Sequence, residues 1–357
     1  MIEKIGERTL HFTDAPRVVG FGSAVGKKEG EGPLSEWFDK IYTDTTMGGE
    51  TWEKAEAALQ KKAAELALKS ADLDSGDVEY VFAGDLLNQC VSSSYGLRDL
   101  EIPFLGQYGA CSTMAQTLSV ASVFVESGAA DTAAAVTSSH FCSAERQFRY
   151  PLQYGGQRTP TAQWTVTGSG SVILSAYRDG KFCSHGEKLD EHSGNLRRQI
   201  GVSHICAGKI VDMGITDANN MGAAMAGAAA DTIYRFLEDT DTVPDDYDLI
   251  VTGDLGMVGT SILYDLLKAD GVDVEKKHKD CGLMIFDTDT QDVHAGGSGC
   301  GCSASVLCSY ILKKMRKREL NSVLFAATGA LMSPTIVQQG ESIPGISHLV
   351  HLTNYSD

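Results

Sequence analysis

The stretch EYVFAGDL, residues 79–86, decides the fold, because a similar stretch, DLIVTGDL, occurs at residues 248–255. Both are short apolar runs that end in Gly-Asp-Leu, a pattern typical of buried strands. A long helical pattern precedes each of them, at 51–71 in the first case and at 221–239 in the second. The two stretches therefore predict an internal duplication of the chain.

The duplication extends beyond these strands. A helical pattern of small residues, GACSTMAQTLSVASVFVESG at 109–128, is followed by a strand pattern at 129–139, and the same order recurs at 299–320 and 321–331. The pattern β-α-β-α-β therefore occurs twice, and this alternation is typical of parallel sheets covered by helices. We predict an α/β fold built from two pseudo-symmetric halves.

We place the N-terminal half at 1–180, the C-terminal half at 210–357 and a crossover segment at 181–209. The mixed polarity of the crossover is typical of a solvated loop or hairpin. In parallel sheets, ligands bind where the carboxyl ends of the strands meet. We therefore expect the functional site between the two halves.

The charge of the chain excludes some classes of partner. Its 47 acidic and 30 basic side chains give a formal net charge of −17, which disfavours nucleic acid or an anionic lipid surface as a broad partner but leaves room for a small anion in a local basic pocket. No apolar run approaches 18 residues, so we expect no transmembrane segment, and the charged N-terminus does not resemble a signal peptide. Nine scattered cysteines suit a reducing cytosol better than a disulfide scaffold.

Cys111 is the first candidate for chemistry, because Gly109-Ala110-Cys111 comes just before a helical pattern. A thiol at the N-terminus of a helix can be a nucleophile, since helix-end N–H groups and the macrodipole stabilise a thiolate and lower its pKa. A small apolar thiol in the protein core has the same sequence pattern. The residues alone leave both interpretations open.

A basic and aromatic segment, HFCSAERQFRYPLQYGGQR at 140–158, is the second candidate region. Its Arg146, Arg149 and Arg158 could bind carboxylates in the two-pronged geometry of guanidinium groups, or could pair with acids at a subunit interface. His140 could face the cavity or could be satisfied within the core. Both alternatives stay open for each of these residues.

Asp85 and Asp254 are the paired acids of the two Gly-Asp-Leu stretches, and Asn88 follows the first of them. Each aspartate could cap the following helix, or could hold a ligand or a calcium ion, although no calcium-loop spacing is present. Cys300 and Cys302 lack the second cysteine pair of a zinc site, and no nucleotide-binding glycine motif follows a first strand. We predict no metal and no cofactor.

Three motifs resemble those of the thiolase superfamily, and within it the ketoacyl-synthase III branch. They are GACSTMAQTL at 109–118, GSGSVILSA at 168–176 and GGSGCGCSASV at 296–306. The resemblance implies a five-layer α/β/α/β/α fold and a homodimer that pairs through the sheet edge next to the nucleophile strand. It also implies that Cys111 stands at the position of the nucleophile.

The auxiliary groups of those synthases are absent from their expected places. The resemblance implies a histidine just after the strand of the second Gly-Asp-Leu stretch, where this chain has Gly253 and Asp254, and an asparagine where it has Cys300. A thiol is a poor substitute for a carboxamide donor. His294 could compensate, since it lies six residues before Cys300.

Longer motifs resemble the stage V sporulation protein AD family of endospore-forming bacteria. Among them are GPLSEWFDKIYTD at 32–44, DMGITDANNMGAAMA at 212–226 and AGGSGCGCSA at 295–304. The resemblance implies a protein that binds dipicolinic acid, free or as its calcium salt, and that works with other proteins of the uptake system to move it into the developing spore. It further implies a location in the cytoplasm or at the periphery of the inner membrane of the developing spore.

We therefore expect a ligand-binding protein without condensing activity. The alternatives are a ketoacyl-synthase-like acyltransferase or condensing enzyme that uses Cys111, and a purely structural assembly subunit. Because helix N-termini bind anions, we expect the helix starts at Ser112 and at Cys302-Ser303 to face the cavity. The candidate ligand-binding residues are Asp85, Asn88, Cys111, Ser112, His140, Arg146, Arg149, Asp254, Ser298 and Cys300.

Overall fold

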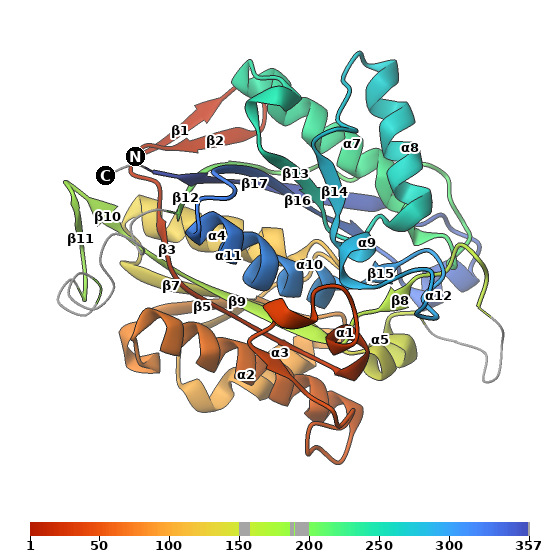
Figure 1. The fold of residues 1–357 in the computed structure, drawn as a ribbon, viewed down its shortest axis with the longest axis horizontal. Helices are drawn as coiled ribbons and strands as arrows, with labels where there is room; N and C mark the ends of the chain where they lie inside the picture. Colours follow the sequence, from red (N-terminus) through yellow and green to blue (C-terminus); the bar gives the residue numbers. More distant parts are fainter. Residues whose placement is uncertain (150–157, 186–188, 190–199, 356–357) are drawn as a thin grey trace.

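The computed structural model describes residues 1–149, 158–185, 189 and 200–355, and it has five layers. Two twisted sheets lie face to face with helices between them, and further helices cover the two outer faces (Figure 1). The predicted five-layer α/β/α/β/α fold is confirmed.

The two sheets have the same strand order and the same directions. The N-terminal sheet has the order β3 (Arg17–Val25), β9 (Gly168–Ser175), β7 (Thr132–Ser139), β5 (Tyr80–Gly84), β6 (Phe104–Gly106). The C-terminal sheet has the order β12 (Ile200–Cys206), β17 (Gly345–Asn354), β16 (Ser322–Ala330), β13 (Leu249–Thr252), β14 (His278–Asp280).

In each sheet the strand that carries Gly-Asp-Leu, β5 or β13, is parallel to both of its neighbours. The strand inserted on the other side, β9 or β17, is antiparallel to both of its neighbours. The sheets join where Arg17 of β3 pairs with Gly201 of β12. The predicted duplication is therefore present in strand order and direction as well as in sequence.

The helices fall into an inner layer and two outer layers. The inner layer contains α4 (Thr113–Ser127), α10 (Cys300–Val306), the π-helical turn η7 (Leu307–Ile311) and α11 (Leu312–Arg316). One outer layer contains α2 (Trp52–Ala71) and α3 (Val91–Leu97), and the other contains α7 (Met221–Thr240) and α8 (Gly256–Ala269) (Figure 1). The four long helical patterns of the sequence all form helices.

Short elements complete the chain. The strands are β1 (Ile2–Ile5), β2 (Thr9–Phe12), β4 (Lys40–Ile41), β8 (Trp164–Thr165), β10 (Tyr177–Arg178), β11 (Lys181–Phe182) and β15 (Gly297–Ser298). The helices are α1 (Lys27–Gly30), α5 (Phe141–Gln147), α9 (Cys281–Ile285), α12 (Pro334–Gln338), η1 (Ser35–Trp37), η2 (Ser75–Asp77), η3 (Asn88–Cys90), η4 (Arg98–Leu100) and η6 (Pro244–Asp246).

The segment 181–209 begins with a hairpin, as its polarity suggests, because β11 pairs antiparallel with β10. Its end forms β12, which pairs with β17 and β2 and therefore belongs to the C-terminal sheet. Ser203 and His204 interrupt the apolar pattern of this strand and hid it in the sequence. Residues 186–188 and 190–199 lie outside the described part of the chain.

Small residues let the inner helices lie directly on the sheets. All seven residues of α10 are buried. A Cβ atom added to Gly170 of β9 would lie 2.2 Å from the carbonyl oxygen of Ala304 on α10. Any side chain at this glycine would push helix and sheet apart.

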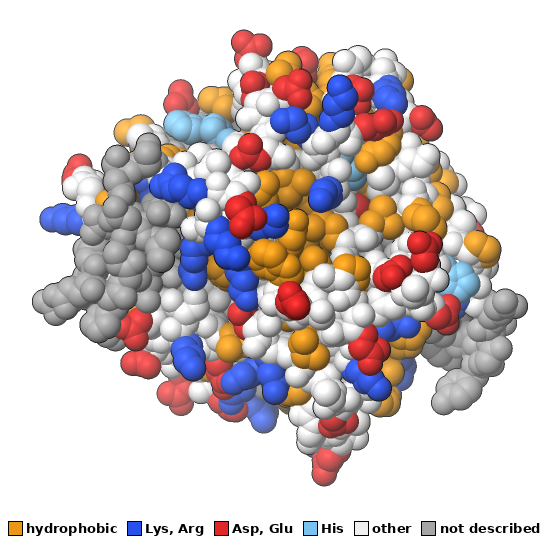
Figure 2. Space-filling model, in the orientation of Figure 1, with side chains coloured by type: hydrophobic (Ala, Val, Ile, Leu, Met, Phe, Trp, Pro, Cys, Tyr) orange, Lys and Arg blue, Asp and Glu red, His pale blue; other side chains and the backbone are white. Residues whose placement is uncertain are grey.

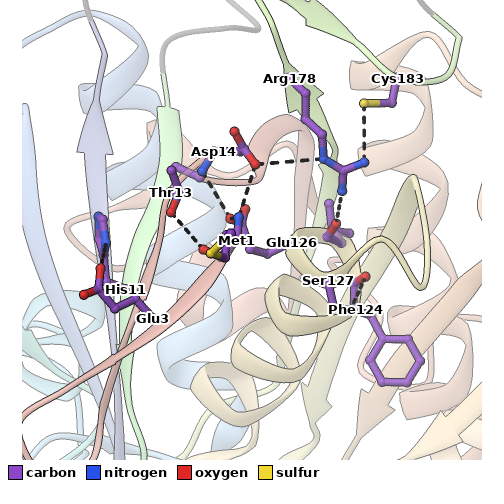
Figure 3. A network of polar contacts seen from close by, with 12 residues as sticks. Met1, Glu3, His11, Thr13, Asp14, Phe124, Glu126, Ser127, Arg178 and Cys183 are labelled. Carbon is purple, nitrogen blue, oxygen red and sulfur yellow. Dashed lines mark hydrogen bonds and ion pairs between the residues drawn. The ribbon is translucent and has the colours of Figure 1, made fainter.

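Helix α4 is tied to other elements at its C-terminal end, far from Cys111. The buried Glu126 accepts hydrogen bonds from the Met1 amine at 2.5 Å and from the Asp14 N–H at 3.1 Å (Figure 3). Arg178 donates to the carbonyl of Val125 at 3.0 Å in the same network. These contacts fix the helix whose other end carries the candidate site.

The negative charge of the protein is not spread evenly over its surface. Lys and Arg side chains gather over α11, beside a hydrophobic area, on the face that Figure 2 shows. None of the helices described is long and apolar enough to cross a membrane.

Candidate ligand-binding site

Cys111 lies in the sharp turn between β6 and α4. Ala110 has a φ of 50°, a left-handed conformation that costs a non-glycine residue energy and often marks functional sites. The Ser112 hydroxyl donates to the carbonyl of Gly109 at 2.7 Å, so it stabilises the turn itself and does not point to a ligand. Gly329 of β16 lies so close that an added Cβ would be 2.4 Å from the Gly109 oxygen. The turn is therefore rigid, and Cys111 is only 1% exposed.

Asp254 faces the Cys111 thiol from the other half of the molecule. It follows β13, and its carboxylate accepts hydrogen bonds from the Ser298 hydroxyl at 3.0 Å, the Gly299 N–H at 2.9 Å and the Thr328 hydroxyl at 2.8 Å. The thiol of Cys111 is also hydrogen-bonded to this carboxylate. A carboxylate thus occupies the side of the sulfur where the resemblance to synthases implies an imidazole.

Cys300 supplies the third group of this site. It is the first residue of α10, and its thiol donates to the carbonyl of Ser138 at 3.0 Å. After burial, the neighbouring Cys111 is the next cause that raises the pKa of Cys300, and Cys300 in turn helps to raise the pKa of Tyr108. The two inner helices therefore begin at facing thiols, next to one carboxylate.

The electrostatics of the site oppose a thiolate. Burial raises the pKa of Cys111 well above its usual value, and the charge of Asp254 raises it further, while Arg149 and the Gly299 N–H act in the opposite direction. The expectation that the helix end lowers this pKa is therefore wrong. A thiolate in this dry centre loses more hydration than the N–H groups of α4 return.

A second pair of buried carboxyl groups lies behind Cys300. Asp85 accepts hydrogen bonds from the N–H groups of Leu87 and Ser93, both at 2.8 Å, and thereby holds the start of α3. Glu56 of α2 accepts hydrogen bonds from the hydroxyls of Ser138 at 3.1 Å and Ser143 at 2.5 Å. Burial, together with the nearby charge of Asp85, raises the pKa of Glu56 to about 8. Glu56 is therefore protonated at neutral pH.

A small pocket lies between the halves and is lined by Glu145, Arg149, Arg158, Ala162, Gln163, Ala218, Asn219 and Met221. Its volume is about 20 Å³, measured as the space open to the centre of a water molecule, which holds about one water. The Gln163 amide donates to the carbonyl of Asp254 at 2.8 Å, so the pocket wall and the Cys111 site are directly joined.

Two arginines line this pocket, and each has an unused N–H group. Arg149 donates to the carbonyl of Gln163 at 2.6 Å and pairs with Glu145 at 3.1 Å, and Arg158 pairs with Asp292 at 2.7 Å. Within the described chain, the buried Nε of Arg149 and Nη1 of Arg158 have no hydrogen-bond partner. Such donors are suited to a carboxylate or a similar anion.

Arg146 and Asn88 are not brought to the pocket. Arg146 forms an ion pair with Glu53 on the surface. Asn88 is exposed, and its backbone N–H donates to Gln147 at 3.2 Å.

The histidines named from the sequence also point elsewhere. His140 contacts the carbonyl of Thr45 at 3.0 Å and stacks on Trp52, and burial lowers its pKa. His294 lies 3.2 Å from Asp292. In the described ranges, no histidine is hydrogen-bonded to Cys111, and no group of three or more His, Cys, Asp or Glu side chains could hold a metal ion.

Sequence reasoning missed Glu56, Gln163 and Asn219. The signal for Glu56 is its position on the apolar face of α2, four residues before the equally buried Gln60. Polar residues at this spacing on a buried face need partners inside the protein. Gln163 and Asn219 carry no comparable signal, because both lie outside regular helices and strands.

Solved structures place this architecture in a known class, the thiolase-like fold of 3-oxoacyl-(acyl carrier protein) synthase III. The enzyme from Aquifex aeolicus VF5 matches with a TM-score of 0.55 and 12% identity over 95% of this chain and 99% of that one. The enzyme from Pseudomonas aeruginosa PAO1 matches with a TM-score of 0.56 and 14% identity over 95% and 98%. OleA of Xanthomonas campestris matches with a TM-score of 0.57 and 11% identity over 96% and 99%.

The sequence comparisons identify the family within this class. The profile of the stage V sporulation protein AD family matches residues 6–353. Stage V sporulation protein AD of Bacillus subtilis (strain 168) is 47% identical over 343 residues, which cover 96% of each chain. The chain belongs to the stage V sporulation protein AD family, and its role is in sporulation.

The protonated Glu56 predicts a pH dependence of stability. The folded protein holds a proton on Glu56 that the unfolded chain releases near pH 4.5, so the free energy of unfolding falls as the pH rises from about 4.5 to about 8. Glu56→Gln removes the ionisable group and therefore this fall in the free energy of unfolding. We expect the variant to gain more than about 1 kcal/mol over the wild type between pH 5.5 and pH 8.5, measured by urea unfolding. Glu65→Gln, a half-exposed acid on the same helix, should show no such gain.

Proposed function

We propose that the protein binds dipicolinic acid, free or as its calcium salt, in the pocket beside Cys111 and acts in its uptake into the developing spore. Other proteins of the uptake system are the expected partners, in the cytoplasm or at the periphery of the inner membrane. One observation carries the proposal: Arg149 and Arg158 line a pocket joined to a Cys111 site that has lost the auxiliary groups of a synthase.

The chemistry of the pocket suits a small dianion. Dipicolinate is a flat ring with two carboxylates, and the unused N–H groups of Arg149 and Arg158 offer a cationic donor to each. Met221 supplies an apolar wall for the ring, and the side chain of Asn219 can add a hydrogen bond. Because the pocket holds only about one water, binding requires these long side chains to move apart.

Condensation of thioesters is disfavoured for two reasons. The Cys111 thiol is protonated beside the carboxylate of Asp254, whereas attack on a carbonyl needs a thiolate. The thiol of Cys300 is engaged with the carbonyl of Ser138 and offers no strong donor to a developing oxyanion. The alternative is an acyltransferase or condensing enzyme that uses Cys111. Two features favour it: the fold and the position of this cysteine.

Calorimetry tests the binding proposal. We expect dipicolinate to bind the wild type, and Arg149→Gln and Arg158→Gln to weaken binding at least 10-fold, since each removes a charge-assisted hydrogen bond. Arg146→Gln is the matched control, because Arg146 lies outside the pocket, and it should change the affinity less than 2-fold. No heat with millimolar dipicolinate would contradict the proposal and favour a structural assembly subunit.

Incubation with acetyl-coenzyme A separates the proposal from the enzymatic alternative. We expect mass spectrometry of the intact protein to show no acetyl adduct on Cys111 after an hour at pH 7.5, because the thiol is protonated and shielded. Cys111→Ser is the control for modification of other cysteines. An adduct that forms within seconds and is lost in the Cys111→Ser variant would favour the enzyme.

The edge strand β6 supports the proposal that the protein is a homodimer. Phe104, Leu105 and Tyr108, on and just beyond this strand, are 40%, 42% and 45% exposed. An unpaired edge with large apolar side chains is a site for pairing with another chain. This edge lies directly before the turn of Cys111. The resemblance implies that related synthases pair through the same edge.

Light scattering after size exclusion tests the dimer. We expect the wild type to be dimeric and Leu105→Lys to be monomeric at micromolar concentration, because a buried unpaired charge at the edge opposes pairing. Met257→Lys changes an apolar residue that is 49% exposed elsewhere and should leave the dimer intact. A monomeric wild type, or a dimeric Leu105→Lys variant, would contradict the assignment.

A further inference from the structure

We propose that Asp280 is the positioning residue of the Cys111 site, and that its carboxylate fixes the turn through which Asp254 reaches the thiol. This proposal rests on the function proposed above only in that it concerns the same site. Asp280 is the last residue of β14, at the edge of the C-terminal sheet, and it has no direct contact with the pocket.

The carboxylate of Asp280 holds both free N–H groups of the turn that follows β13. Oδ2 accepts from the Leu255 N–H at 2.8 Å, and Oδ1 accepts from the Gly256 N–H at 3.0 Å. Gly256 has a φ of +62°, a left-handed conformation that glycine adopts without strain. The two bonds need two acceptor oxygens, which only the ionised carboxylate presents equally.

The turn in question carries Asp254, so its position sets the contact with Cys111. Asp254 precedes the two held N–H groups by one and two residues, and its own carboxylate is committed to Ser298, Gly299 and Thr328. A shift of the turn would move the Asp254 carboxylate relative to the thiol. The expected result is a lower pKa and a higher reactivity of Cys111, because the carboxylate raises that pKa.

A chain of hydrogen bonds connects Asp280 to the surface. The Thr252 hydroxyl donates its hydrogen to Asp280 Oδ2 at 2.6 Å. Because this hydrogen is used, the Nε2–H of His278 must donate to the Thr252 oxygen, 2.9 Å away. Nδ1 of His278 then accepts from the hydroxyl of Tyr264 at 3.0 Å. Tyr264 and His278 line a groove of about 260 Å³ that also contacts Asp280. Protons can therefore reach Asp280 without opening the core.

Among the described residues, the titratable groups near Asp280 are Asp254 from the turn, Tyr264 from α8, His278 and Cys281 from its own segment, and Cys302 from α10. Burial, with the charge of Asp254, raises the pKa of Asp280 to about 6. Burial lowers the pKa of His278 to about 4, so this imidazole stays neutral while Asp280 titrates. Protonation of Asp280 as the pH falls from 7 to 5 is thus expected to release one of the two N–H groups.

Cysteine alkylation measures the position of the turn without any ligand. The full-length protein is treated with N-ethylmaleimide, and mass spectrometry of peptides gives the rate at Cys111 relative to the rates at the buried Cys206 and Cys308. We expect Asp280→Asn, which keeps the shape but cannot accept both bonds, to raise this ratio at least 5-fold at pH 7.5. Asp287→Asn, which changes a partly exposed acid in the loop after α9, is the matched control and should leave the ratio unchanged.

The pH profile distinguishes positioning from simple loss of stability. In the wild type the ratio should rise as the pH falls through about 6, and in Asp280→Asn it should be high and flat. A general loosening would raise all buried cysteines together and leave the ratio constant, and that outcome would overturn the proposal. If the ratio responds as expected but dipicolinate does not bind, the proposed function fails and the role of Asp280 stands.

Discussion

The structure depends on the close packing of the inner helices, above all the fully buried α10, against the two sheets. All seven residues of α10 are buried between two sheets, so their side chains must be small enough for helix and sheet to touch. The same constraint acts on the turn before α4, where β16 lies against the backbone. The two inner helices begin at the same place, and this close packing therefore brings Cys111 and Cys300 together in the dry centre of the molecule.

This dry centre decides what the site can do. A helix N-terminus favours a thiolate only when the thiolate's lost hydration is replaced. At Cys111, burial and the carboxylate of Asp254 raise the pKa of the thiol by more than the neighbouring N–H groups lower it. The buried acids remain tolerable because each is saturated with hydrogen bonds, as Asp254 and Asp85 are, or keeps its proton, as Glu56 does. The thiolase-like scaffold thus carries a cysteine whose surroundings oppose a thiolate.

The sequence predicted the fold well because the duplication is visible in it, and the Gly-Asp-Leu repeats made Asp85 and Asp254 candidates without deciding between helix capping and a place in the site. The arginines were harder. Arg146 and Arg149 are close in sequence, but α5 ends at Gln147, so helical spacing does not apply to both and only Arg149 enters the pocket. Asp280 could not have been found, because it is one acid in a charged edge strand and its role comes from a turn 25 residues earlier.

The burial of the cysteines has a consequence for how long the molecule can remain intact. Six of the nine thiols are buried, and burial raises the pKa of every one of them. Peroxides and other oxidants attack the anionic form of sulfur, and they must first reach it. These six neutral, enclosed thiols are therefore protected from oxidation over long storage without a disulfide.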